Sequence, residues 1–83
     1  MSSARQSIGN RINKDISMFS ESISSIDMQS LSAEEREVVE LAKMYAADSK
    51  AWLSKKDYNT SFASISYAHG LLDAIRKLKQ LID

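Results

Sequence analysis

The chain contains no proline and only two glycines, Gly9 and Gly70, in 83 residues. These two residue types most often end helices and form turns, so their scarcity leaves long helices as the default expectation. A chain of this length buries only about 60–65% of the surface that its unfolded form exposes, so its core is expected to be thin. Residues 1–83 therefore predict a single small all-α domain.

Apolar residues recur at helical spacing, three or four apart, in three segments. The first stripe comprises Ile8, Ile12, Ile16, Phe19, Ile23 and Ile26. In the second segment the expected inward face comprises Val38, Leu41, Ala42, Tyr45, Ser49 and Trp52. The third segment carries two stripes, one of Tyr58, Phe62, Ile65, His69, Leu72 and Ile75, and one of Ala68, Leu71, Ala74, Leu78 and Leu81. The predicted helices are Arg5–Ile26, Ala33–Ser54 and Tyr58–Leu81.

Two boundaries are marked by side chains that cap helices. Ser32 and Glu35 have the spacing of a capping box, in which each side chain bonds the backbone amide of the other. Asp57 is a favoured N-cap for the third helix. The connection before it is very short, and short connections between long helices join antiparallel neighbours. The pattern predicts a three-helix up-down-up antiparallel bundle.

Composition excludes several classes of function. The chain has no cysteine and one histidine, so disulfides, thiolate metal sites and multi-histidine clusters are excluded within one chain, and we expect no metal and no cofactor. Eleven basic and eleven acidic residues leave no net basic field, which makes a nucleic-acid partner unlikely. No stretch approaches the roughly 18 apolar residues of a membrane span, and no secretory signal is expected. We expect a cytoplasmic protein.

One run of residues carries a family resemblance. The features are Tyr45 and Asp48, Asp57 and Tyr58, Ala63, and the run Tyr-Ala-His-Gly-Leu-Leu-Asp-Ala from Tyr67 to Ala74. With these, the chain resembles an archaeal family known as domain of unknown function number three-five-seven, over Val38 to Leu78. Members of that family typically have glycine where Lys56 stands. The resemblance implies a small all-helical archaeal protein and brings no activity with it.

Gly70 lies in the middle of the predicted third helix, where glycine costs about 0.5–1 kcal/mol relative to alanine. Folding the hairpin about residues 55 and 56 brings Gly70 level with Leu41 and Ala42. Close approach of the two helices at that point is one reason for a glycine there. We expect helix close-packing at Gly70, Leu41 and Ala42, with contact to a ligand as the alternative.

The polar residues of the hairpin form a candidate patch. His69 and Asp73 are four apart and share a helix face, where a carboxylate can orient an imidazole. With Tyr45, Asp48 and Tyr67 they bring together groups that acid–base chemistry uses. No serine or cysteine is obviously activated by His69, and no glycine-rich phosphate loop is present. A structural His69–Asp73 pair, a binding site and a catalytic site are the three interpretations.

Three functions follow from these observations. The first is a non-enzymatic protein–protein interaction or adaptor module, or a homodimer, because the core is thin and no catalytic constellation is evident. In that case Trp52, near the hairpin tip, either seals the core or contacts a partner. The second is a small-ligand or nucleotide-related enzyme that uses Tyr45, Asp48, His69 and Asp73. The third is RNA association through the basic helix ends, which carry Arg5, Arg11, Lys14, Arg76, Lys77 and Lys79.

Overall fold

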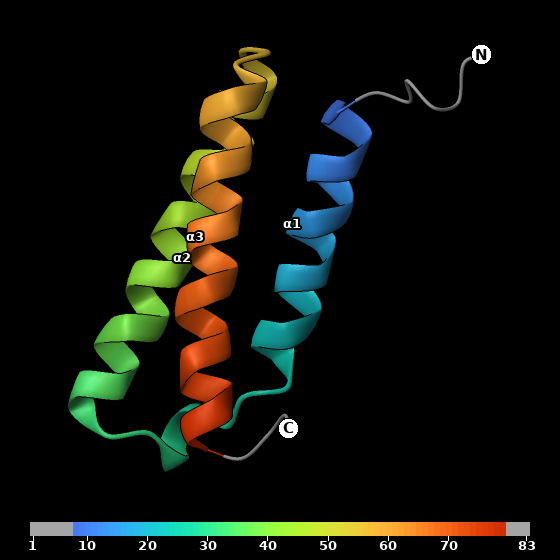
Figure 1. Cartoon of the computed structure of the whole chain (residues 1–83). Coiled ribbons are helices and arrows are strands. Elements are labelled where there is room, and N and C mark those ends of the chain that lie inside the picture. The colour runs from blue at the N-terminus through green and yellow to red at the C-terminus, as the bar shows by residue number, and fades with distance from the viewer. Residues whose placement is uncertain (1–7, 80–83) are drawn as a thin grey trace.

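The computed structural model of the chain describes residues 8–79. Within them lie three α-helices, α1 (Ile8–Ser24), α2 (Ala33–Ser54) and α3 (Tyr58–Leu78), and a 3₁₀ turn, η2 (Met28–Ser30). Helices α2 and α3 form an antiparallel hairpin, and α1 runs beside α3 in the same direction (Figure 1). The fold is the predicted all-α three-helix up-down-up bundle. The predicted start of the first helix, at residues 5–7, lies outside the described residues. The third helix ends at Leu78, with Lys79 as its C-cap, rather than continuing to the predicted Leu81.

The boundaries of α2 are those that the capping residues predict. The Ser32 amide donates to Glu35 Oε1 at 2.8 Å, and the Glu35 amide donates to Ser32 Oγ at 3.1 Å. The end of α1, in contrast, comes at Ser24 rather than at the predicted Ile26. The hydroxyls of Ser24 and Ser25 donate to carbonyl oxygens three residues back, and such bonds compete with helix continuation.

The hairpin turn has the geometry of a Schellman motif. The Asp57 amide donates to the Trp52 carbonyl at 3.0 Å, and the Lys56 amide donates to the Leu53 carbonyl at 2.9 Å. Lys56 has φ of 62°, in the left-handed region that favours glycine. The turn therefore keeps the backbone conformation that a glycine would favour, with a lysine in its place. Asp57 then caps α3, accepting from the Thr60 amide.

The core runs the length of the bundle between the three helices. It comprises Ile12, Ile16, Phe19, Ile26, Leu31, Val39, Ala42, Ala46, Ile65, Ala68, Leu72 and Ile75. The predicted stripes of α1 and α3 mostly point inward, although Ile8, Phe62, Ala74 and Leu78 are exposed and Leu81 lies outside the described residues. For α2 the predicted face is partly wrong. Leu41 and Trp52 are exposed, and the inward line is Val39, Ala42, Ala46 and Ser49.

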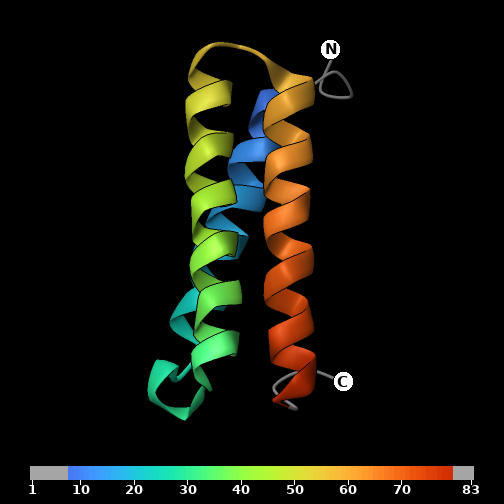
Figure 2. The same ribbon diagram turned by 90° about the vertical axis from the view of Figure 1, so that its left-hand side faces the viewer.

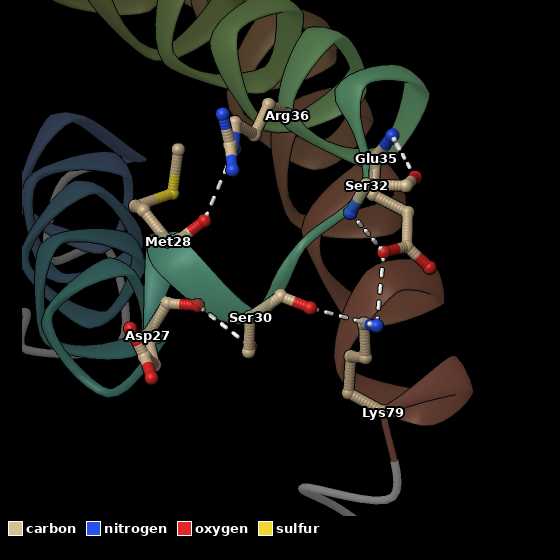
Figure 3. Close-up of polar contacts among 7 residues, drawn as sticks. All are labelled: Asp27, Met28, Ser30, Ser32, Glu35, Arg36 and Lys79. Atoms are coloured by element: carbon tan, nitrogen blue, oxygen red, sulfur yellow. Dashed lines mark hydrogen bonds and ion pairs between the residues drawn. The ribbon is translucent and has the colours of Figure 1, made fainter.

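Polar contacts close the end of the bundle at which α2 begins and α3 ends (Figure 3). Lys79 Nζ lies 3.0 Å from Glu35 Oε1 and donates to the Ser30 carbonyl at 3.2 Å. Arg36 Nε donates to the Met28 carbonyl at 3.1 Å. The turn between α1 and α2 is thereby tied to the last turn of α3 and to the first turn of α2.

Candidate functional site

Hydrogen bonds join α2 directly to α3 at Ser49 and Ser61, where the two helices come close together. Each hydroxyl donates to the carbonyl oxygen of the other residue, at 2.8 and 2.7 Å, and both side chains are fully buried. Small side chains allow the two backbones to come this close. Each buried hydroxyl has a hydrogen-bond partner across the contact, as buried polar groups require.

Gly70 does not mediate the helix close-packing that we expected. It is exposed, and a Cβ atom added to it would meet nothing within 4 Å. Of its two expected neighbours Ala42 is buried in the core, and Leu41 is itself exposed. The prediction of close packing at Gly70, Leu41 and Ala42 is therefore wrong, because the face of α3 that carries Gly70 is not the face that meets α2.

His69 is turned toward α1. Its Nε2 lies 2.8 Å from the Asp15 carbonyl oxygen, and its ring meets the Phe19 ring edge-on at 5.7 Å between centroids. A carbonyl oxygen can only accept, so Nε2 carries the proton in this contact. Asp73, the expected partner of His69, instead lies 3.4 Å from Arg76 Nη1. His69 thus fastens α1 to α3, and the structure pairs it with α1 backbone rather than with Asp73.

A wide, shallow groove of about 540 Å³ runs between α1 and α3 at this level. Its lining residues are Arg11, Asp15, Met18, Phe62, Ser66, His69, Gly70 and Asp73. The groove contains two of the five candidate polar residues, His69 and Asp73. Because Nε2 of the imidazole is already engaged with the α1 backbone, only the other ring nitrogen is left for chemistry in the groove.

The other candidate polar residues lie on a different side of the hairpin. Tyr45 and Tyr67 meet edge-on with ring centroids 4.6 Å apart, and Asp48 is exposed one turn along α2 from Tyr45. Tyr67 and His69 are two residues apart, which places them about 200° apart around α3. The structure therefore does not bring Tyr45, Asp48, Tyr67, His69 and Asp73 together into one patch.

The basic helix ends do not converge either. Because α1 and α3 run in the same direction, the start of α1 and the end of α3 lie at opposite ends of the bundle (Figure 1). Arg76 contacts Ser22 and Asp73, and Lys79 contacts Glu35 and Ser30. Arg5 lies outside the described residues. The structure thus separates the two halves of the basic surface that we considered for RNA.

Most of the exposed large apolar side chains of the described residues belong to the side of the hairpin that faces away from α1. Figure 2 shows this side of the hairpin in front. Eight large apolar side chains are exposed within residues 8–79, and five of them are at positions of α2 and α3 on this side. Met44 is 63% exposed, Tyr67 53% and Leu78 70%. We call this surface the outer hairpin face; its apolar residues are Leu41, Met44, Trp52, Tyr67 and Leu78.

Sequence reasoning missed this face because α2 carries two apolar lines. The inner line meets the core, and the outer line comprises Leu41, Met44 and Trp52, with the polar Asp48 between the last two. A single-stripe interpretation merged Leu41 and Trp52 into the inner line. The second line was the available signal that α2 carries apolar side chains outside the core.

The family model for a protein of unknown function (DUF357) matches residues 14–81. The chain belongs to the DUF357 family. The match includes the whole hairpin and all but the first residues of α1, beyond the stretch in which the motif residues were recognised. No curated protein matches the chain.

A second hollow of this DUF357 chain lies between α1 and α2, with a volume of about 280 Å³. Its floor is apolar and its α2 rim carries two lysines; the lining residues are Ile16, Phe19, Ser20, Ile23, Lys43, Ala46, Ala47 and Lys50. Ala46 and Ala47 are too small to fill the space beside α1. The hollow is thus the consequence of placing alanines where α2 faces α1.

Metal and membrane features of this DUF357 chain can be stated for the described residues. Among residues 8–79 no three histidine, aspartate or glutamate side chains converge to hold a metal ion. None of the helices in that part of the chain is both long enough and apolar enough to cross a bilayer. The pKa of Glu35 is lowered from its ordinary value by the hydrogen bond from the Ser32 amide and by Lys79.

Proposed function

We propose that this DUF357 protein is a non-enzymatic protein–protein interaction module that binds its partner through the outer hairpin face. The observation that carries this proposal is the concentration of exposed apolar side chains on one side of α2 and α3. Exposed apolar patches of more than a few hundred Å² on small proteins mark interaction sites. The setting we propose is the cytoplasm of an archaeon, which the missing cysteines and the motif resemblance support.

Aromatic and methionine side chains suit such a surface. Tyr67 and Trp52 supply large contact area with few rotatable bonds, and Met44 adapts its shape to a partner. Tyr45 supports Tyr67 from the facing helix through their edge-on ring contact. In this role Tyr45, Asp48 and Tyr67 serve recognition rather than catalysis.

The two alternatives lose their structural support. The enzymatic hypothesis needs Tyr45, Asp48, His69 and Asp73 near one substrate, and these residues lie on two sides of the hairpin. The RNA hypothesis needs the basic ends of α1 and α3 side by side, and they lie at opposite ends of the bundle. The positions of these residues therefore favour neither the enzymatic nor the RNA hypothesis as a second candidate function.

Photo-crosslinking from within the face tests the proposal. A benzophenone amino acid replaces Tyr67, and the matched control carries it at Phe62, an aromatic residue of α3 that is 43% exposed beside the α1 groove. In cells that naturally make the protein, we expect an adduct from position 67, identified by peptide mass spectrometry, and none from position 62. Met44→Glu should abolish the adduct. Equal adducts from both positions, or none from position 67, would contradict the proposal.

A further inference from the structure

We propose that the outer hairpin face binds a second copy of this chain, with the two copies antiparallel about a two-fold axis. The inference rests on the interaction role proposed above and names its partner. It is carried by the charges at the two ends of the face, by the position of its aromatic centre and by its size.

Two exposed charges of opposite sign lie near the two ends of the α2 side of this face. Glu37 lies in the first turns of α2 and Lys55 is the C-cap of the same helix. They are eighteen residues apart, which is five helical turns, so their side chains leave in nearly the same direction about 27 Å apart. Lys55 Nζ lies 5.0 Å from the centroid of the Trp52 ring, which places it at the edge of the face. Both residues are exposed, and neither has an ion-pair partner among residues 8–79.

These two charges complement themselves when α2 of one copy faces α2 of the other with the helices antiparallel. In a two-fold dimer the same patch lies on both copies, so each contact occurs twice. An antiparallel arrangement places Glu37 of each copy opposite Lys55 of the other at both ends. A parallel two-fold arrangement instead places α2 of each copy opposite α3 of the other, so Glu37 and Lys55 of the two copies do not meet. A second copy is therefore the occupant that the charges of the face fit.

The aromatic pair lies at the centre of this arrangement. The midpoint between Glu37 and Lys55 falls at residue 46, one position from Tyr45, whose ring contacts Tyr67. Aromatic residues at the middle of an interface dominate its binding energy. Asp48 lies within one turn of the midpoint, and the tyrosine hydroxyls of the second copy are the donors that a carboxylate buried there requires.

The size of the face suits a stable dimer. Helices of 22 and 21 residues are about 30 Å long. Two such helices packed side by side, with their side chains, present a surface roughly 20 Å wide. The resulting footprint of about 600 Å² is close to the roughly 800 Å² of accessible surface that each partner of a standard interface buries.

Sedimentation equilibrium of the purified chain tests the inference. We expect a mass twice the 9.3 kDa of one chain. At low salt Glu37→Lys and Lys55→Glu should each weaken dimerisation at least about tenfold, because each creates like-charge contacts at both ends. An equimolar mixture of the two variants should recover the wild-type constant within about threefold, since both ends of the mixed dimer again pair opposite charges. In a parallel two-fold dimer residues 37 and 55 of the two copies do not meet, so mixing the two variants would not restore the wild-type constant and the inference would be overturned.

Two further variants serve as controls, with circular dichroism confirming that each is folded. Tyr67→Glu should give a monomer, and Phe62→Glu, on the other side of α3, should leave the dimer unchanged. A wild-type chain that stays monomeric at about 100 μM, or charge variants that dimerise unchanged, would overturn the inference. A monomer that still forms an adduct with a different protein from position 67 would overturn the inference alone. A monomer without any such adduct would overturn both proposals.

Discussion

The two seams along α3 are built differently. Toward α2, the backbones come together at Ser49 and Ser61, whose hydroxyls bond the opposite carbonyls. Toward α1, contact depends on the longer side chains of Phe19, His69 and Arg76, and a hollow remains where α1 passes α2. The hairpin is therefore held together by close approach of the α2 and α3 backbones, whereas α1 is held by side-chain packing.

Replacing Phe19 by alanine should have the largest effect. The ring is almost fully buried and covers both the core and His69. Its removal beside an existing hollow should cost about 3–4 kcal/mol of unfolding free energy, measured by urea denaturation. Amide exchange should accelerate in α1 more than in the hairpin. Equal acceleration in all three helices would show that α1 is as firmly held as α2 is.

Ser49→Ala should destabilise the protein by about 1–2 kcal/mol, because it removes a buried hydroxyl and breaks the reciprocal pair. The same change at Ser61 should cost a similar amount. The double variant should cost less than the sum of the two single variants, because either single change already breaks the contact between the two hydroxyls. Additive free energies in this double-mutant cycle would show that the two hydroxyls act independently.

Gly70→Ala should stabilise the protein by about 0.5–1 kcal/mol, because alanine favours the helix and its Cβ meets open space. The measurement is the shift of the thermal midpoint in circular dichroism. A loss of stability at this position would mean that the helices approach each other at Gly70 after all. Ala74→Gly, the reverse change at an exposed position of the same helix, should move the midpoint the other way.

Lys56→Gly should stabilise the hairpin by about 0.5–1 kcal/mol. Lys56 has φ of 62°, a conformation that costs a residue with Cβ roughly 1–2 kcal/mol. Glycine removes this cost, but its greater conformational entropy in the unfolded chain offsets part of the gain. The unfolding midpoint in urea measures the gain. Lys55→Gly, one residue earlier at φ of −90°, should destabilise instead. A Lys56→Gly variant less stable than the wild type would contradict the left-handed turn.

The smallest expected effect concerns pH. The Ser32 amide and Lys79 lower the pKa of Glu35, so the carboxylate stabilises the fold above its ordinary pKa in the unfolded chain. That contribution should disappear as the pH falls through the lowered value. Glu35→Gln keeps the capping box and loses the ion pair. The stability difference between wild type and variant should therefore shrink from neutral pH to acid, and a difference independent of pH would contradict the Lys79 contact.

Much of the fold was predictable from local signals. Three helices and the bounds of α2 were predicted from the scarcity of glycine and proline, the Ser32–Glu35 capping box and the Asp57 cap. The motif from Tyr67 to Ala74 indicated the family, which the match over residues 14–81 shows. These signals work because a cap bonds its own first turn and a helical stripe depends on 3.6 residues per turn, with no reference to distant parts of the chain.

The candidate site was not predictable in the same way, because the rotation of each helix about its axis is set by its neighbours. Apolar residues on two sides of α2 allowed two rotations, and only packing against α1 and α3 decided that Val39 points inward and Leu41 outward. The rotation of α3, set by its own neighbours, turned His69 toward Asp15 and left Gly70 in open space. The sequence by itself determined which segments are helical, and the tertiary structure decided which side of each helix meets the core.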